Sequence, residues 1–257
     1  MLAIRELDVR FGERVVARIG ALDVAAGEIV GIAGESGSGK SMTALAILGL
    51  APLQGATVRG SIVLDGVELV GLDERRLRAI RGRRVAMIMQ SPRASLNPTL
   101  RLGDLLARTL RLHDVPRGQV AGRAEKAMRS VLLDPVLLER YPHQVSGGQA
   151  QRFAIALVLA LGADVVLADE PTSALDVTVQ SEVVELLRQL RDDRRTAQIF
   201  ISHDLAVIGQ LADRVVVMRA GEVVEEGPAA AVLADPVAEY TRELVAAIPR
   251  IGVTAAP

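Results

Sequence analysis

A loop rich in glycine and serine follows a short apolar run. Residues 34–41, GESGSGKS, fit the pattern G-x-x-x-x-G-K-[ST], with the strand-like run IVGIA before them and a helix-like run after them. The glycines permit backbone conformations closed to other residues, so successive N–H groups can point at phosphate oxygens. Lys40 would reach the β- and γ-phosphates, and Ser41 offers its hydroxyl to Mg²⁺. A Gly/Ser-rich turn without function is the alternative, which this context disfavours.

Two carboxylates stand at the end of a second apolar run, VVLADE at residues 165–170. Asp169 can hold Mg²⁺ through water, and Glu170 can polarise an attacking water. An acidic pair at a strand end is, by itself, more often a solvated turn. Beside the loop at residues 34–41, the pair predicts an enzyme that hydrolyses a nucleoside triphosphate, without specifying which enzyme.

The apolar pattern indicates the elements that position these residues. Residues 29–33, 164–169 and 198–202 are short continuous apolar runs, typical of central parallel strands. Helical patterns adjoin them: between residues 181 and 193, apolar residues recur at i, i+3, i+4 and i+7. Alternating strands and helices predict an α/β fold with a parallel sheet.

Three other segments have patterns of their own. Alternation in the first thirty residues predicts antiparallel strands, and two β-rich runs at residues 214–227 predict a hairpin around Ala220 and Gly221. Residues 91–161 lack strand-like runs and contain helical patterns broken by prolines. We therefore expect a helical insertion there.

Length and composition narrow the class. The chain of 257 residues is 50% hydrophobic, and its formal net charge of -1 gives no steering toward nucleic acid or anionic lipid. It has no cysteine, which excludes disulfides and thiolate-held metals. Charges at Arg5, Glu6 and Asp8 interrupt any signal-peptide region, and the apolar run at 153–163 falls well short of the roughly 18 residues of a membrane span. We therefore expect a cytoplasmic protein.

Residues 145–152, VSGGQAQR, contain a further helix start. Ser146 and Gln149 have the spacing of a capping box before an apolar run at residues 153–161. Unlinked to anything else, this would be an ordinary helix start. Beside the loop at 34–41 it resembles the signature motif of ATP-binding cassette (ABC) ATPases. That resemblance implies that two cassettes close head to tail around two ATP molecules, each signature serving the nucleotide of the other cassette.

Other elements of the ABC family appear in order. Gln90 in IMQSP resembles the Q-loop glutamine, SALD at residues 173–176 the D-loop, and His203 in FISHD the switch histidine. A lone histidine after a strand is usually structural and a lone glutamine carries no information, so order and spacing decide here. Phe11 in RFGE stands where the family places an aromatic that stacks on adenine, although Phe11 could equally be a core residue.

The resemblance implies a site built from five sets of residues. The catalytic residues are Lys40, Gln90, Glu170 and His203, and Mg²⁺ is held by Ser41, Gln90 and Asp169. ATP contacts come from Phe11, Gly34, Glu35, Ser36, Gly37, Ser38, Gly39, Lys40, Ser41, Met42 and Gln90. The signature is Ser146, Gly147, Gly148 and Gln149, and the D-loop is Ser173, Ala174, Leu175 and Asp176.

The same resemblance implies an α/β P-loop NTPase fold with a RecA-like core, an N-terminal antiparallel β subdomain and an inserted helical subdomain. We expect a single ABC ATPase domain over residues 1–257. Its catalytic core would comprise residues 1–90 and 162–227, its helical subdomain residues 91–161, and a C-terminal extension residues 228–257.

Several longer stretches are similar to the ATPases of the oligopeptide, dipeptide and nickel importers. They include SPRASLNP, YPHQVSGGQ, DEPTSALDVTVQ and the ending at residues 235–249, while IMQSPRASLNP leans toward nickel-type or metallophore-type members. The chain departs from that branch at Val145 and Ala150, which replace leucine and glutamine. It also lacks a C-terminal cysteine cluster and the His-Pro that usually precedes Tyr240.

Such an ATPase would work on the cytoplasmic face of the membrane. The resemblance implies two membrane permease subunits, a second ATPase that is identical or related, and an extracytoplasmic substrate-binding protein, with no role for nucleic acid. Peptides, nickel and metal chelates are all open as substrates. The alternative is a soluble ABC ATPase that acts as an assembly scaffold, as in iron-sulfur cluster assembly. A DNA-repair ABC ATPase is disfavoured, because that class inserts long coiled coils.

Overall fold

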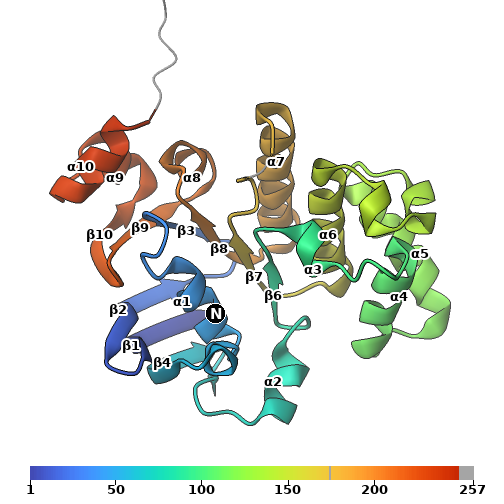
Figure 1. Ribbon diagram of the computed structural model, residues 1–257, viewed down its shortest axis with the longest axis horizontal. Helices are drawn as coiled ribbons and strands as arrows, with labels where there is room; N and C mark the ends of the chain where they lie inside the picture. The colour runs from blue at the N-terminus through green and yellow to red at the C-terminus, as the bar shows by residue number, and fades with distance from the viewer. Residues whose placement is uncertain (174, 249–257) are drawn as a thin grey trace, which may run out of the picture.

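A single ten-stranded sheet runs through the molecule, in the order β5-β4-β1-β2-β10-β9-β3-β8-β7-β6 (Figure 1). The computed structural model describes residues 1–173 and 175–248. In chain order the strands are β1 (Leu2–Phe11), β2 (Arg14–Val24), β3 (Ile29–Ala33), β4 (Thr57–Leu64), β5 (Val67–Glu68), β6 (Val85–Ile88), β7 (Val165–Asp169), β8 (Ala197–Ser202), β9 (Arg214–Arg219) and β10 (Glu222–Pro228).

Strands β9, β3, β8, β7 and β6 form the parallel part of the sheet. Every residue of β3, β7 and β8 is buried, which explains why their sequences are continuous apolar runs rather than alternating ones. The three central strands predicted from those runs are confirmed. Because the strands are parallel, the loops that follow β3, β7 and β8 emerge at one edge of the sheet.

The antiparallel part contains β5, β4, β1 and β2, as the alternation in the first thirty residues predicts for its first two strands. The predicted hairpin is also present: β9 and β10 pair antiparallel, joined by Ala220 and Gly221. Both linking residues have positive φ, 50° and 89°, as a two-residue hairpin turn requires. Strands β4, β5 and β6 were not predicted from the sequence.

Helices cover both faces of the sheet and extend beyond one end of it (Figure 1). The helices are α1 (Lys40–Ile47), α2 (Glu74–Ile80), α3 (Pro92–Ser95), α4 (Leu102–Leu112), α5 (Arg117–Ser130), α6 (Gly147–Leu161), α7 (Val177–Arg194), α8 (Leu205–Leu211), α9 (Ala229–Ala234) and α10 (Glu239–Ala246), with 3-10 turns at Ala51–Gln54, Pro135–Glu139 and Pro142–Gln144.

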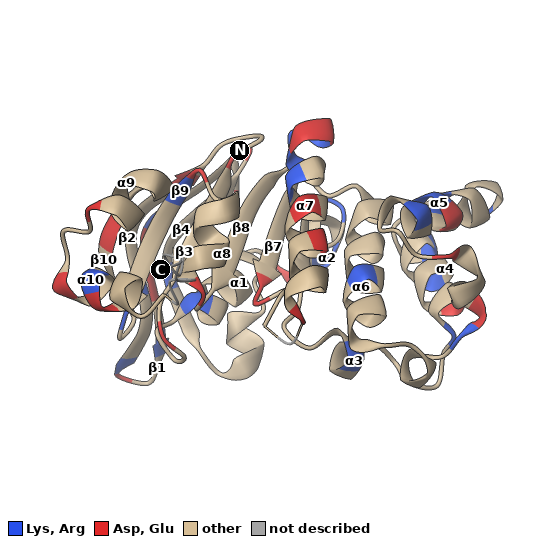
Figure 2. Cartoon of the chain, turned by 90° about the horizontal axis from the view of Figure 1, so that it is seen from above, with Lys and Arg blue, Asp and Glu red and all other residues tan. Residues whose placement is uncertain are grey.

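Residues 91–161 contain helices and 3-10 turns and no strand, as predicted. Figure 2 shows α4 and α5 at one end of the molecule, with α6 and α7 between them and strand β7 of the sheet. Prolines start new elements here: Pro116 caps α5, and the last two 3-10 turns each begin at a proline. Helix α6 begins at Gly147, earlier than the apolar run alone indicates, because Ser146 caps it.

The sheet divides the apolar core into two clusters. Alternate residues of β3 belong to opposite ones: Ile29 and Ala33 pack with α6, α7 and α8, whereas Val30 and Ile32 pack with α1 and the antiparallel strands. This follows from the two-residue period of a strand. Both faces of the sheet are thereby packed against apolar side chains, which fixes the position of the edge from which the loops emerge.

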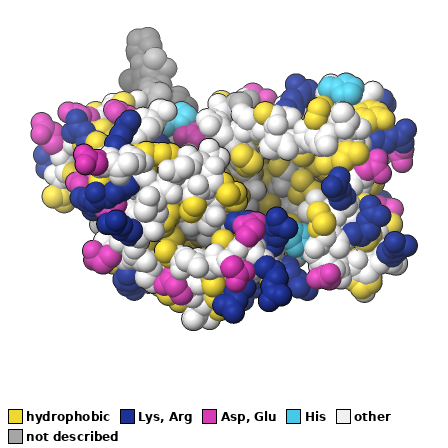
Figure 3. All heavy atoms as spheres, turned by 60° about the horizontal axis from the view of Figure 1, so that its bottom comes forward, with side chains coloured by type: hydrophobic (Ala, Val, Ile, Leu, Met, Phe, Trp, Pro, Cys, Tyr) yellow, Lys and Arg dark blue, Asp and Glu magenta, His cyan; other side chains and the backbone are white. Residues whose placement is uncertain are grey.

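One face of the molecule is hollowed near its centre (Figure 3). A cavity of about 610 Å³ lies where residues 113–116, between α4 and α5, approach α2, and Arg83 and His113 line it. Burial and the nearby Arg83 charge lower the pKa of His113.

Within residues 1–173 and 175–248, no helix combines the length and apolar character needed to cross a membrane.

Candidate functional site

The loop at residues 34–41 connects the buried strand β3 to helix α1. Gly34 and Gly39 both have positive φ, 147° and 103°, and a Cβ on either would lie 2.2 Å from a backbone carbonyl oxygen. No larger residue fits at these two positions. Gly39 is the N-cap of α1 and offers no side-chain hydrogen bond, so the first N–H groups of that helix stay available for an anion.

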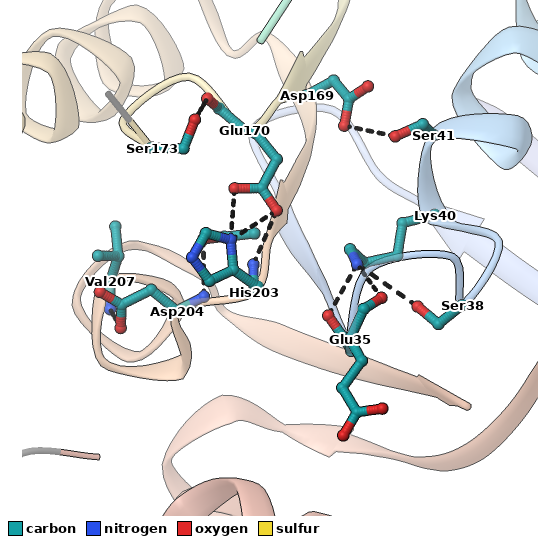
Figure 4. A network of polar contacts seen from close by, with 12 residues as sticks. Glu35, Ser38, Lys40, Ser41, Asp169, Glu170, Ser173, His203, Asp204 and Val207 are labelled. Atoms are coloured by element: carbon teal, nitrogen blue, oxygen red, sulfur yellow. Dashed lines mark hydrogen bonds and ion pairs between the residues drawn. The ribbon is translucent and has the colours of Figure 1, made fainter. Parts of the chain in front are cut away.

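Lys40 points back into this loop (Figure 4). Its Nζ donates to the carbonyl oxygens of Gly34 at 2.7 Å and Glu35 at 2.8 Å, and only 5% of the residue is exposed. Burial lowers the pKa of Lys40, although the carboxylates of Glu170, Asp169 and Glu35 oppose the shift. A buried ammonium held by carbonyls is placed to receive a phosphate group.

Ser41 and Asp169 meet across the site. The Ser41 hydroxyl donates to Asp169 Oδ1 at 3.0 Å, although the two residues lie at the ends of different elements, α1 and β7. Burial raises the pKa of the Asp169 carboxyl, and the Ser41 hydrogen bond only partly offsets that effect. A buried carboxylate beside a hydroxyl is a set of hard oxygen donors, which fits Mg²⁺.

Glu170 and His203 face each other from the ends of β7 and β8 (Figure 4). His203 Nδ1 lies 2.9 Å from Glu170 Oε1 and 2.7 Å from Oε2, and the His203 backbone N–H donates to Oε1 at 3.1 Å. Glu170 has a φ of 49°, and its own N–H donates to Ile201 at 2.9 Å. The carboxylate is therefore held in one orientation at the edge of the loop-bearing face.

A pocket of about 760 Å³ joins these groups. Phe11 lines it and is 39% exposed, so the alternative that Phe11 is a core residue is wrong. Gln90 also lines the pocket and is exposed. Of the remaining predicted residues, Ser38 and Asp169 lie behind the wall, against Lys40 and Ser41. The lining residues are Phe11, Arg14, Val16, Gly34, Glu35, Ser36, Gly37, Gly39, Lys40, Ser41, Met42, Gln90, Glu170, His203 and Leu244.

Arg14, Val16 and Leu244 line this pocket but were missed by the sequence analysis. Arg14 and Val16 lie at the start of β2, three and five residues beyond Phe11, and could have been found by their proximity to it. No sequence signal marks Leu244, because it is an ordinary apolar residue of a short helix far along the chain.

The signature segment lies elsewhere. Ser146 accepts from the Gln149 N–H at 3.1 Å, and Gln149 Oε1 accepts from the Ser146 N–H at 2.9 Å, so the predicted capping box is present. Ser146 and Gly147 are exposed, and within the described part of the chain residues 146–149 contribute nothing to the pocket wall. The helix terminus is thus free to meet another molecule.

The D-loop segment follows Glu170 directly. The Ser173 N–H and hydroxyl approach the Glu170 carbonyl oxygen at 3.3 and 3.1 Å. Asp176 caps α7 by accepting from the Val179 N–H at 3.0 Å, and Leu175 is half-buried. Ala174, the fourth predicted residue of this segment, lies outside the described residues.

A family model described as ABC transporter matches residues 19–173. The chain belongs to the ABC transporter family. It is an ABC transporter ATPase, and the fold agrees with solved cassettes: the post-hydrolysis dimer of the ATP-binding cassette MJ0796 bound to ADP and Pi has a TM-score of 0.79 at 28% identity, over 89% of this chain and 99% of that one. The cassette cbiO1 from Clostridium perfringens also has a TM-score of 0.79, at 24% identity over 97% and 96%. The predicted fold class is confirmed.

Named relatives of this ABC ATPase are transporter subunits. A probable peptide ABC transporter ATP-binding protein, y4tR of Sinorhizobium fredii, is 43% identical over 97% of this chain and 77% of its own length. A putative peptide import ATP-binding protein of Brucella abortus is 44% identical over 86% and 68%. The glutathione import ATP-binding protein GsiA of Salmonella typhimurium is 40% identical over 98% of this chain, which spans 42% of GsiA.

Proposed function

We propose that this ATPase energises the import of peptides through separate permease subunits. The observation that carries the proposal is the shared pocket that brings together Lys40 from the start of α1, Glu170 from the end of β7 and His203 from the end of β8. The names of the relatives supply the substrate class, since they are peptide and glutathione import ATPases. The functional division into core (1–90 and 162–227), helical subdomain (91–161) and extension (228–257, of which 249–257 lie outside the described residues) is part of the proposal.

Binding of ATP falls to the loop and its surroundings. The N–H groups at the start of α1 and the Lys40 ammonium neutralise the phosphates, which relieves the cost of keeping Lys40 buried. Phe11 stacks on the adenine ring from the exposed side of the pocket. Ser41, Asp169 and Gln90 would hold Mg²⁺, which supplies further neutralisation of phosphate charge when bound.

Hydrolysis uses the carboxylate at the end of β7. Glu170 takes a proton from a water molecule while the oxygen of that water bonds to the γ-phosphorus. The bond between the γ-phosphorus and the oxygen that bridges the β- and γ-phosphates breaks, which leaves ADP and phosphate. His203 orients that carboxylate through its ring and its backbone N–H, and its exposed ring can turn toward the γ-phosphate. The protein contributes mostly positioning and charge neutralisation.

The exposed signature terminus calls for a second cassette. Because Ser146 and Gly147 are exposed and residues 146–149 lie away from the pocket wall, we propose that these residues bind the ATP held by a partner cassette, which is a copy of this chain or a related ATPase. The D-loop would join the two sites across that interface. MJ0796, a structural relative, is itself described as a dimer.

A mixing experiment tests the composite site. Lys40→Ala and Ser146→Arg should each be inactive, because one loses the phosphate loop's cation and the other blocks the signature terminus. Mixed in equal amounts, the two variants should regain activity. Each dimer that contains one copy of each variant has two composite sites. One of these sites combines the intact loop of the Ser146→Arg chain with the intact signature of the Lys40→Ala chain. Recovery supports a self-pairing composite site. Continued inactivity of a mixture shown to dimerise would reject it.

Partners decide between transport and scaffolding. We expect the chain, tagged in its native cell and extracted in mild detergent, to copurify with two permeases and an extracytoplasmic binding protein, at the cytoplasmic face of the membrane. Mass spectrometry of the complex identifies them. Recovery without any membrane partner would instead support the soluble assembly scaffold.

The binding protein also identifies the substrate. The IMQSPRASLNP stretch leans toward nickel-type or metallophore-type members, with peptides, nickel and metal chelates all open as substrates, whereas the relatives named above favour peptides. Isothermal titration of the recovered binding protein with short peptides and with Ni²⁺ separates the two. Peptide binding without Ni²⁺ binding is the expected result, and the reverse would restore the nickel prediction.

A further inference from the structure

Helix α10, far along the chain, reaches the phosphate loop. The backbone N–H of Glu35 donates to the Tyr240 hydroxyl at 3.0 Å. Four residues later on the same helix, Leu244 lines the 760 Å³ pocket. Residues four apart share one face of a helix, so a single face of α10 supplies both a hydrogen bond to the loop and part of the pocket wall.

The Tyr240 side chain is held from both sides. Only 4% of the residue is exposed, and the Arg219 guanidinium lies 4.7 Å from the centre of its ring, a cation–π arrangement. Arg219 ends β9, and the preceding carbonyl, that of Met218, is the one that a Cβ on Gly34 would strike. One strand end therefore fixes the loop at Gly34 and the tyrosine that contacts the loop at Glu35.

Helix α10 is itself anchored to the sheet. The Glu225 carboxylate of β10 accepts the N–H groups of Val237 at 2.8 Å and Ala238 at 3.0 Å, directly before the helix begins. Figure 1 shows α10 and α9 together beside β10, at the opposite end of the molecule from α4 and α5. The helix is thus attached to the sheet that carries the catalytic residues and not to the helical insertion.

Tyr240 and Lys40 hold opposite sides of one residue. The Glu35 carbonyl accepts from Lys40 Nζ at 2.8 Å, while the Glu35 N–H donates to Tyr240. When Lys40 turns toward phosphate, it releases the Glu35 carbonyl. Among the described residues, the hydrogen bond to Tyr240 is then the side-chain contact that still holds the backbone of Glu35. The hydroxyl is in place to keep the loop open for the incoming anion.

We propose that α10 is a working part of the ATP site, with Tyr240 as a positioning residue for the phosphate loop and Leu244 as a wall against the bound nucleotide. This rests on the proposed assignment of the pocket to ATP. One neutral hydrogen bond contributes modestly, so its loss should weaken ATP binding about three- to tenfold. The step that follows binding does not involve Tyr240, so kcat at saturating ATP should change less than about twofold.

The tyrosine content of the chain gives a direct test. It contains two tyrosines and no tryptophan, and the other tyrosine, Tyr141, lies in the helical insertion. In Tyr141→Phe, tyrosine fluorescence reports on Tyr240 alone, and its emission should change on titration with Mg·ATP. Tyr240→Phe should raise the Kd for ATP while Tyr141→Phe leaves it unchanged. A Tyr240→Phe protein that binds ATP like the wild type, even one that melts earlier, would overturn the proposal.

A second pair of variants tests the pocket wall. Both Leu244 and Val245 are half-buried and pack against the same core cluster, but Leu244 lines the pocket and Val245 does not. Leu244→Ala should therefore raise the Kd for ATP about threefold or more, whereas Val245→Ala, which loses similar packing, should not. Equal effects of the two variants would reject the wall role of Leu244. Failure of the wild-type chain to bind ATP is a different result, and it would reject the proposed function itself.

Discussion

Glu170 and His203 form a closed pair, with His203 Nδ1 2.7 Å from one carboxylate oxygen of Glu170 and the His203 backbone N–H bound to the other. The two residues directly follow neighbouring parallel strands, β7 and β8, so the sheet sets the distance between them. The protein itself therefore orients the carboxylate, and ATP and water are the reactants that must be placed against it.

Removing the charge of that carboxylate should stop turnover and leave binding intact. For Glu170→Gln we expect ATP hydrolysis to fall about 10²- to 10⁴-fold, the usual size of a lost general base, because the amide cannot accept the proton from water. Phosphate release measures turnover, and a fluorescent ATP analogue measures affinity. Glu139→Gln, at an exposed position of the helical insertion, is the control. Near-normal turnover of Glu170→Gln would contradict the assignment.

Lysine is rare enough in this chain to provide its own control. The chain has two lysines, Lys40 in the loop and Lys126 in α5. Lys40→Ala should raise the Kd for ATP more than about 100-fold, because it removes hydrogen bonds between a cation and two phosphates, each worth about 1.5–3 kcal/mol. Lys126→Ala should bind like the wild type. Unchanged affinity of Lys40→Ala in a nucleotide titration would count against the phosphate loop.

The ionised carboxylate of Asp169 should lower the free energy of unfolding at neutral pH. Burial raises the pKa of this carboxyl in the folded state, so its contribution to stability is greatest below the unfolded-state pKa and is lost as pH rises through the folded-state pKa. In the absence of nucleotide, Asp169→Asn should therefore melt at or a few degrees above the wild type at pH 7–8, and its advantage should shrink at lower pH.

Thermal melts at several pH values measure that effect, with Asp193→Asn at an exposed position of α7 as the control. With Mg·ATP present the order should reverse, since the variant loses an oxygen donor to Mg²⁺. An Asp169→Asn protein that is less stable than the wild type at pH 8 without nucleotide would show that the Ser41 hydrogen bond outweighs the burial cost.

ATP affinity should depend on an aromatic ring at position 11, whether phenylalanine or tyrosine supplies it. Phe11→Ala should weaken ATP binding about 5- to 100-fold, the range expected for one base stacked on an aromatic side chain, while Phe11→Tyr should retain affinity. Displacement of the bound fluorescent analogue by ATP, and separately by GTP, measures the affinity of each variant for nucleotide. An equal loss of affinity in both variants would indicate packing of the β1–β2 turn rather than stacking.

Much of the fold could be predicted because its signals are local. The buried strands β3, β7 and β8 are continuous apolar runs, and the hairpin is marked by Ala220-Gly221. Strand β6 was missed because VAMI is only four residues long and follows a basic stretch. Strand β4 was missed because only Ile62 and Leu64 near its end are buried, and β5 was missed because it consists of two exposed residues.

The sequence by itself determined which chemical groups are present: a phosphate loop, a strand-end acidic pair, a capped signature helix and the apolar runs that carry them. Each depends on residues within about one turn or strand, where spacing dictates geometry. The tertiary structure alone decided which groups meet. Ser41 reaches Asp169, His203 reaches Glu170, and Tyr240 reaches Glu35, because the strand order sets β3 beside β8 and β9, and β8 beside β7. A run of apolar residues shows that a strand is buried, but it does not show which other strands lie beside it in the sheet.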